Sequence, residues 1–210
     1  MIDFPESTAV HRRIPKEAFY KHLPLSAALK AKFVSDVESI IVSNSLTKEN
    51  LNLAKDAKIK EIMLLSINMK KRNFDGKIVE AIARQNPHKL VFLLQYDNER
   101  QFALYHSRLY RTEWEDDKER DLSLHGNSMD EIWDDLVRQV AISSPKVLER
   151  KNQTIDEQLK NQNEINRLNQ LIRKTDAAAW KEQQPKKRFE LYTKLQAYQK
   201  QLEAITHGKA

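Results

Sequence analysis

The fold is decided by the stretch IKEIMLLSINM at residues 59–69. This stretch is nearly continuous in apolar residues, contains neither glycine nor proline, and is bracketed by lysines. Such a run is typical of a strand that is buried on both faces of a sheet. Residues 59–69 therefore predict a central strand. The segments on either side of it are interpreted as neighbouring strands and as helices that cover the sheet.

The segments before this strand predict two helices and a second strand. Pro15 favours a helix from about 15 to 22, and Ser26 is a suitable cap for another helix through about 36. β-Branched residues alternate with polar ones over residues 37–43, which indicates a strand with one serine-rich face. Thr47 and Asn50 then predict a short helix that ends near Lys55.

The segments after the central strand predict a helix, a hairpin and a second helix. Asp75 looks like the cap of a helix that ends at Asn86 and Pro87. The runs KLVFLLQY (89–96) and FALYHSRLY (102–110), with a turn between them, predict a β-hairpin. Residues 111–128 are predicted to form a loop or an extended cover. An amphipathic helix is expected over about 128–142, with an apolar stripe formed by Met129, Ile132, Trp133, Leu136, Val137 and Val140. This order indicates an α/β domain at residues 1–145, a compact mixed sheet of about four strands with covering helices.

Residues 146–210 differ from the preceding residues in composition and apolar spacing, and they predict a helical appendage. Apolar residues recur at helical spacing in two arms, and Pro185 lies between the arms. The simplest arrangement is an antiparallel, coiled-coil-like helical hairpin, and the alternative is a homodimer formed through the arms. A buried Gln162 or Asn169 would fix the register of either arrangement. The stripes are Ile155, Leu159, Ile165, Leu168 and Ile172 in the first arm, and Leu191, Leu195, Tyr198, Leu202 and Ile205 in the second.

The composition excludes several classes of chemistry. The chain has no cysteine, so disulfides, thiolate nucleophiles and cysteine-ligated metal sites are absent. With three glycines it has no glycine-rich loop for phosphate, and its six histidines show no metal-binding spacing. We therefore predict neither a cofactor nor a metal. No apolar run reaches the length of a membrane span, and the first residues lack a hydrophobic signal core, so a cytoplasmic protein is expected.

The net charge of +6 is distributed unevenly. Residues 1–112 carry 19 basic and 12 acidic side chains, whereas residues 113–135 carry ten acidic and two basic ones. Residues 146–210 carry 14 basic and eight acidic side chains. The acidic segment nearly cancels the charge before it, so the excess positive charge belongs to the appendage.

Three clusters of cations are candidates for contact with nucleic acid. Each cluster could bind phosphates, although a solvated surface is the ordinary explanation for such a triplet. The cluster in the appendage is predicted to lie at the tip of the hairpin, beside two aromatic residues. Trp133 is expected in the core and Trp114 at the sheet edge. The candidate nucleic-acid-binding residues are Arg12, Arg13, Lys70, Lys71, Arg72, Lys186, Lys187 and Arg188, and the candidate partner-binding residues are Trp180, Phe189, Leu191, Leu195, Tyr198 and Leu202.

A divergent metal-dependent nuclease is the enzymatic alternative. Such enzymes place a carboxylate and, two residues later, a lysine along a strand that meets DNA. Asp56 and Lys58 have this spacing beside the central strand, and Asp36 or Glu38 could supply a second carboxylate. The chain contains four such acid-x-lysine triplets, and about three are expected by chance from its composition.

Five segments together resemble a bacterial family of unknown function. They are HRRIPKEAFY (11–20), KEIMLLSINMKK (60–71), HKLVFLLQYD (88–97), LVRQVA (136–141) and AWKEQQPKKRFELYTKLQ (179–196). Members of that family are typically encoded beside SNF2-type helicases and type III restriction–modification subunits. The resemblance implies association with DNA processing or phage defence, and it supplies no catalytic residues.

Three hypotheses follow from the residues and the resemblance. The first is a non-enzymatic accessory subunit whose α/β domain docks on a helicase, methyltransferase or restriction subunit, while the basic hairpin contacts DNA or a second protein. In this hypothesis the acidic segment faces a basic partner or covers the domain's own basic surface. The second is the divergent nuclease, and the third is a structural homodimer formed through the appendage.

Overall fold

The computed structural model describes residues 4–22, 25–117, 121–143 and 153–207. The chain divides into two compact units, residues 1–141 and residues 142–210. The predicted boundary between residues 145 and 146 lies outside the described residues.

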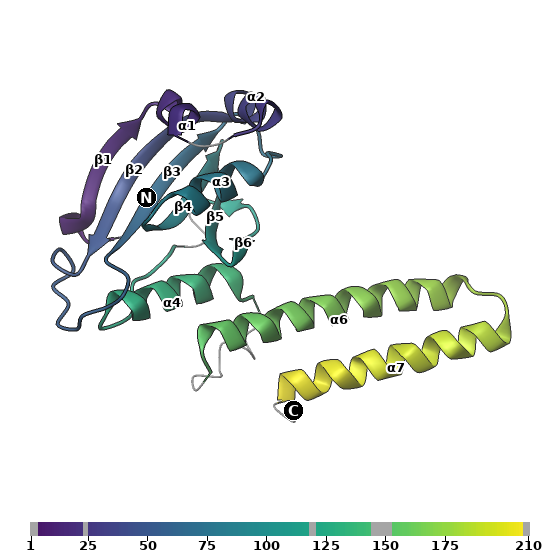
Figure 1. The fold of residues 1–210 in the computed structure, drawn as a ribbon. Coiled ribbons are helices and arrows are strands. Elements are labelled where there is room, and N and C mark those ends of the chain that lie inside the picture. The colour runs from purple at the N-terminus through teal and green to yellow at the C-terminus, as the bar shows by residue number, and fades with distance from the viewer. Residues whose placement is uncertain (1–3, 23–24, 118–120, 144–152, 208–210) are drawn as a thin grey trace. The chain divides into compact units, whose positions relative to one another are not determined.

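The first unit contains a seven-stranded sheet and its covering helices (Figure 1). The mixed α/β class is confirmed, whereas the prediction of about four strands is wrong. The strands are β1 (Ala9–Ile14), β2 (Val37–Thr47), β3 (Glu61–Met69), β4 (Lys89–Tyr96), β5 (Glu99–His106), β6 (Arg108–Arg111) and β7 (Glu115–Asp116). The helices are the short 3₁₀ helix η1 (Glu6–Thr8), α1 (Lys16–His22), α2 (Ala27–Asp36), α3 (Lys77–Gln85) and α4 (Met129–Ala141).

The strands follow the order β1-β2-β3-β4-β5-β6, and β7 also pairs with β5. Only β3 and β4 pair in parallel; the other pairs in the described sheet are antiparallel. A parallel pair needs a crossover, and α3 supplies it between these two strands. The predicted central strand is therefore β3, which has β2 on one side and β4 on the other.

The strands that sequence patterns missed lie toward the two edges of the sheet. In β1, five of the six residues are exposed, so no alternation of buried and exposed residues marks it as a strand. The return strand predicted over 102–110 is wrong in its second half: it breaks at Ser107, whose φ of 62° turns the chain back into the four-residue strand β6. β7 has two residues. Edge strands bury few side chains, and their pairing depends on the neighbouring strand rather than on their own apolar residues.

The predicted helix over residues 47–55 is wrong. β2 continues through Thr47, and turns follow it. Asn50 accepts a hydrogen bond from the Thr47 N–H through Oδ1 (2.8 Å), and its own N–H donates to Thr47 Oγ1 (3.3 Å). Asn52 then adopts a φ of 51°. The reciprocal bonds between Thr47 and Asn50 are those of a capping box, and the Leu51 N–H donates to the Thr47 carbonyl at 3.1 Å, so a first helical turn does form. The left-handed backbone at Asn52 then prevents this turn from continuing as a helix.

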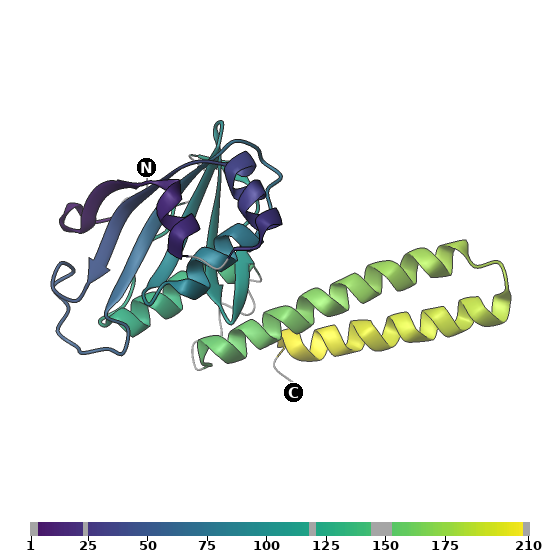
Figure 2. The same ribbon diagram turned by 45° about the horizontal axis from the view of Figure 1, so that its top comes forward.

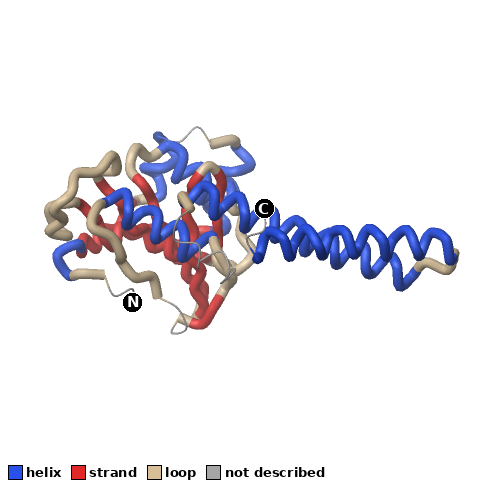
Figure 3. The backbone as a smooth tube through the Cα atoms, turned by 90° about the horizontal axis from the view of Figure 1, so that it is seen from below, coloured by secondary structure: helices blue, strands red, loops and turns tan. Residues whose placement is uncertain are grey.

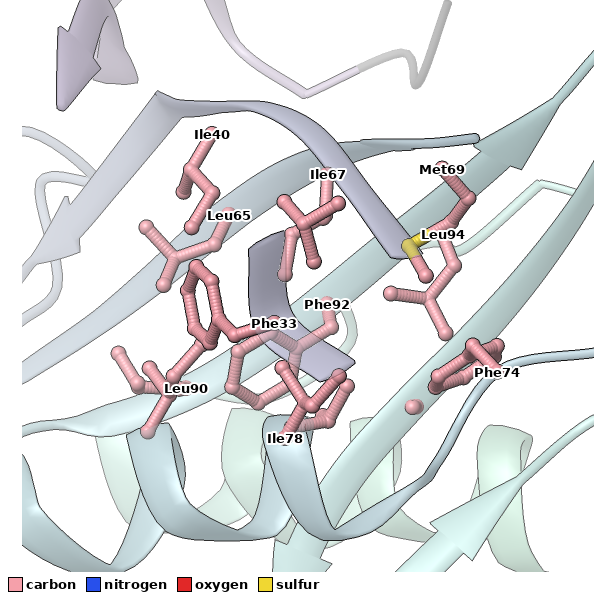
Figure 4. Packing of buried hydrophobic residues seen from close by; sticks show 14 of the residues in the cluster. Phe33, Ile40, Leu65, Ile67, Met69, Phe74, Ile78, Leu90, Phe92 and Leu94 are labelled. Atoms are coloured by element: carbon pink, nitrogen blue, oxygen red, sulfur yellow. The ribbon is translucent and has the colours of Figure 1, made fainter. Parts of the chain in front are cut away.

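One face of the sheet forms the main core beneath the first three helices. Phe33 of α2 and Ile78 of α3 pack with Ile40, Leu65 and Phe92 from three neighbouring strands (Figures 1 and 4). All five are at most 2% exposed. The Ser26 cap of α2 is confirmed, because its Oγ accepts the Leu29 N–H at 3.2 Å.

α4 covers part of the opposite face, against β3, β5 and β6. The six residues of its predicted apolar stripe are all buried, including Trp133. The Trp133 Nε1–H donates to His106 Nδ1 of β5 at 3.3 Å. Figure 2 shows the sheet between α4 and the other helices of this unit.

The second unit consists of two long helices, α6 (Ile155–Lys181) and α7 (Pro185–His207). They run antiparallel, side by side (Figure 3). Thr154 and Glu157 form a reciprocal capping box at the start of α6. Gln162 is buried, as predicted for a residue that sets the register, whereas Asn169 is exposed. Within the described ranges, every helix is either too short or too polar to cross a membrane.

Candidate functional site

The connection between α6 and α7 presents exposed aromatic rings among cations. We call residues 180–189 the hairpin tip. Trp180 and Phe189 are each 73% exposed, more than any other large apolar side chain in the described part of the chain. The packed part of α6 ends at Ala179, which is 0% exposed. Trp180 follows it immediately, so its indole lies beyond the last buried position of α6.

The sequence explains why the chain turns at this place. α6 ends at Lys181, where the Glu182 N–H still donates to the Ala178 carbonyl. Pro185 begins α7, because its fixed φ suits the first helical position and its missing N–H leaves no donor unsatisfied there. The tip is thus a short connection between two regular helices. Trp180 lies in the last turn of α6 and residues 185–189 in the first turns of α7, and all of them are exposed.

The cations at the start of α7, Lys186, Lys187 and Arg188, are solvent-exposed. The first two form no ion pair with another described residue. The Arg188 guanidinium lies 5.8 Å from the centre of the Tyr192 ring. Because successive helical residues are about 100° apart, the three cations point to different sides of α7. The tip therefore combines cations around its circumference with two accessible aromatic rings.

The other predicted partner-binding residues belong to the packing of the hairpin. Leu195 is buried, whereas Leu191, Tyr198 and Leu202 are partly buried. α6 is the element that packs against α7, so this stripe of residues joins the two helices. Trp180 and Phe189 are the members of the predicted set that remain exposed.

The second predicted cation cluster is engaged within the α/β unit. The Lys70 ammonium donates to the Val34 carbonyl at 3.0 Å. Lys71 lies 2.6 Å from the Asp36 carboxylate, and Arg72 lies 2.7 Å from Glu99. These interactions connect the segment that follows β3 to α2 and to the start of β5. The three side chains therefore have structural partners, unlike the cations of the hairpin tip.

The first cluster contributes to a group of cations at one end of the sheet. Arg12 and Arg13 lie on the exposed edge strand β1. Lys16 donates from Nζ to the Val37 carbonyl at 2.7 Å. Burial lowers the pKa of Lys16, and the nearby positive charges of Lys70 and Arg13 lower it further. Sequence reasoning missed Lys16, because a lysine after Pro15 is an ordinary residue of a helical first turn.

The structure separates the residues of the nuclease hypothesis. Asp36 is the last residue of α2 and Glu38 lies at the start of β2, whereas Asp56 and Lys58 lie in the loop after the other end of β2. An 11-residue strand spans roughly 30 Å. The Asp56 side chain is 87% exposed and lies 2.6 Å from Lys48 Nζ. Among the described residues, no cluster of three or more acidic, histidine or cysteine side chains is placed to hold a metal ion.

Asp36 is a buried hydrogen-bond acceptor. Its carboxylate accepts from Lys71, from Ser35 Oγ and from the Asp75 N–H. Burial raises the pKa of Asp36, but these hydrogen bonds outweigh burial and hold the pKa below its ordinary value. Through these bonds the Asp36 carboxylate joins the end of α2 to Lys71 and Asp75, which lie between β3 and α3. Its role is therefore structural.

Part of the acidic segment 113–135 binds the domain that contains it. Asp130 accepts hydrogen bonds from the N–H groups of Ile59 (2.9 Å) and Lys58 (3.0 Å), which together lower its pKa. Glu131 lies 3.4 Å from Lys55. The start of α4 is therefore tied to the loop between β2 and β3. Residues 118–120 of this segment lie outside the described residues.

Comparison with known proteins identifies one family. The profile of DUF4391, a domain of unknown function, matches residues 2–202. No curated protein and no solved structure matches the chain. The match covers both the α/β unit and nearly all of the hairpin, and on this basis the chain belongs to the DUF4391 family.

Proposed function

We propose that this protein is a non-enzymatic accessory subunit of a bacterial DNA-processing or phage-defence complex, in which the hairpin tip contacts DNA. One observation carries the proposal: two aromatic rings, each 73% exposed, stand among cations at the end of a long helical arm. The resemblance found in the sequence supplies the setting, with a helicase, methyltransferase or restriction subunit as the larger partner of the α/β unit.

The exposure of the two rings favours a binding role. An aromatic side chain buries about 150–250 Å² when it is fully packed, and each Å² of apolar surface removed from water contributes about 25 cal/mol. Because both rings are largely exposed, neither gains much of this stabilising free energy within the hairpin. Trp180 and Phe189 could be replaced by polar residues with little loss of stability. Their surface is therefore available to a ligand.

The shape of the tip favours unpaired nucleotides over duplex DNA. A helix with its side chains is about 10–12 Å wide, so two helices side by side are too broad for a major groove of about 12 Å. The tip can reach phosphates from outside the groove, but its rings cannot reach stacked bases there. Unpaired bases offer open faces on which aromatic rings stack, and their phosphates offer partners to Lys186, Lys187 and Arg188.

Binding of a labelled 20-nucleotide single strand to the full chain tests the proposal. Changing Lys186, Lys187 and Arg188 together to Gln is expected to weaken binding at least tenfold and to flatten its dependence on salt, because fewer counterions are released. The double variant Trp180→Ala, Phe189→Ala is expected to weaken single-strand binding more than duplex binding. Fluorescence anisotropy at two salt concentrations measures both effects.

A second triple variant is the matched control. Changing Arg173, Lys174 and Lys194 to Gln removes the same charge from exposed positions farther along the same helices. If the control and the tip variant weaken binding equally, the charge of the hairpin matters and the tip does not. If the unaltered protein binds no DNA, either alone or with a co-purified partner, the proposal is wrong.

A further inference from the structure

A trough lies on the face of the sheet opposite the main core. It has a volume of about 620 Å³ and is lined by residues of β1, β2, β3 and β4 and by the segment before β1. Ile41, Leu64, Ser66 and Leu93 line it, and they alternate with the residues that pack beneath α2 and α3. A volume of this size is typical of a site for a small molecule.

Two irregularities of the sheet open onto this trough. The pairing of β1 with β2 shifts between Ala9 and Arg12, and the pairing of β2 with β3 shifts between Val42 and Asn44. His11 falls in the first shift with a φ of 49°, a left-handed conformation that is unfavourable for a residue with a side chain. Ser43 falls in the second, and both residues line the trough. Bulges redirect side chains and are common beside functional sites.

The floor of the trough carries polar groups with unused hydrogen-bonding capacity. Ser43 Oγ and Ser66 Oγ lie 2.6 Å apart, and either can donate to the other. The pair uses one of its two hydroxyl hydrogens, so the second hydrogen and several lone pairs remain. The Gln95 amide lines the same trough and has no partner among the described residues. Ser66 pairs with Leu93, two residues before Gln95, which places their Cα atoms about 8 Å apart.

The lining determines the class of ligand. Lysine and arginine are absent from the described lining, and Glu6 is its one carboxylate, so a phosphate would meet no neutralising charge. Glu6 and His11 are too few to form a metal site. Ile41, which is partly exposed, provides an apolar surface beside the polar groups, whereas Leu64 and Leu93 are almost fully buried. These features suit a neutral, flat molecule whose edge both donates and accepts hydrogen bonds.

We propose that this trough binds the base of a nucleoside, with the ring against Ile41 and its edge hydrogen-bonded to the Ser43–Ser66 pair and to Gln95. Nucleobases and carboxamides share this edge chemistry, but a base has the larger apolar face. The site is independent of the hairpin tip, which belongs to the other unit.

Titration of the isotopically labelled full chain by nuclear magnetic resonance tests the proposal. The probes are adenosine, uridine, adenosine 5′-monophosphate and N-acetylglycinamide. At least one nucleoside is expected to shift amide signals of β2, β3 and β4, and the monophosphate is expected to bind no more tightly than adenosine. Ser66→Ala and Gln95→Ala should each raise the Kd about three- to tenfold, the usual effect of one lost hydrogen bond.

Ser45→Ala is the matched control. Ser45 lies on the same strand as Ser43, but its Oγ donates to Glu61 at 2.5 Å and it does not line the trough. Its Kd for the nucleoside should be unchanged. Absence of nucleoside binding, equal effects of all three variants, tighter binding of the monophosphate, or tighter binding of N-acetylglycinamide than of both nucleosides would each overturn the proposal.

Discussion

At the scale of single residues, the structure assigns several charged side chains to support of the fold. Asp36 was a candidate metal ligand in the sequence, and it is instead a buried acceptor for three donors. Asp130 and Glu131 belong to an acidic segment, yet both bind the loop between β2 and β3. A charge pattern in a sequence does not reveal which charges are already satisfied within the fold.

Replacing Asp36 is expected to reduce stability. Asp36→Ala removes a buried acceptor and leaves Ser35 and the Asp75 N–H without it, which should cost about 2 kcal/mol in the free energy of unfolding. Glu38→Ala is the control, because Glu38 is exposed and its loss should cost less than about 0.5 kcal/mol. Urea unfolding followed by circular dichroism measures both. Equal stability of the two variants would contradict the structural role of Asp36.

The same variant has an expected dependence on pH. The pKa of Asp36 is lower in the folded protein than the ordinary value of 3.8, so the folded state binds this proton less readily than the unfolded state. The stabilisation from its charge is therefore complete above that value and is lost as the pH falls below it. The difference in stability between the unaltered protein and Asp36→Ala should shrink as the pH is lowered from 7 to about 3.

At the scale of elements, local periodicity identified the helices and the buried strands. The stripe of α4 is buried at all six predicted positions, and the predicted hairpin is present as β4 and β5. Its return strand, predicted over 102–110, instead runs from Glu99 to His106 and breaks at Ser107. After β2, Thr47 and Asn50 cap a single turn, and the left-handed φ of 51° at Asn52 prevents its extension into the predicted helix. β1 and β7 escaped prediction, and most of β6 was predicted as the end of the return strand rather than as a strand of its own. Pairing with a neighbour defines an edge strand, and that pairing is not local in the sequence.

Gln162 should limit the stability of the hairpin. Its side chain is 2% exposed and donates to Asn166 at 2.9 Å. Gln162→Leu is expected to raise the free energy of unfolding by about 1 kcal/mol, because an apolar side chain replaces a desolvated amide. Asn169→Leu, at an exposed position of the same helix, should change it by less than about 0.5 kcal/mol. A loss of stability in Gln162→Leu would show that the hydrogen bonds of Gln162 outweigh its desolvation.

At the scale of the whole molecule, the chain contains two compact units. The α/β unit has its own core on both faces of the sheet. The hairpin is held together by its own stripe and carries the excess positive charge of the chain. This division suits a protein in which one unit docks on a larger subunit and the other contacts DNA.

A shortened chain that ends at Ser143 tests this division. It should unfold cooperatively, because the core of the α/β unit is contained within residues 1–141. It should also lose single-strand binding, because the hairpin tip is missing. Thermal unfolding and fluorescence anisotropy measure the two properties. If the shortened chain binds DNA as well as the full chain does, the cations of the α/β unit, rather than the tip, are the contact.

The sequence by itself determined the central strand, the β-hairpin, α4 and the two long helices, together with the location of the excess charge. Each of these depends on side chains close together in the chain, whose periodicity reports which face is buried. Only the tertiary structure decided the number of strands, the burial of Asp36, the convergence of Arg13, Lys16 and Lys70, and the trough between the bulges of β1 and β2. These features arise where segments distant in the sequence meet, and the pairing of such segments depends on the free energy of the whole fold.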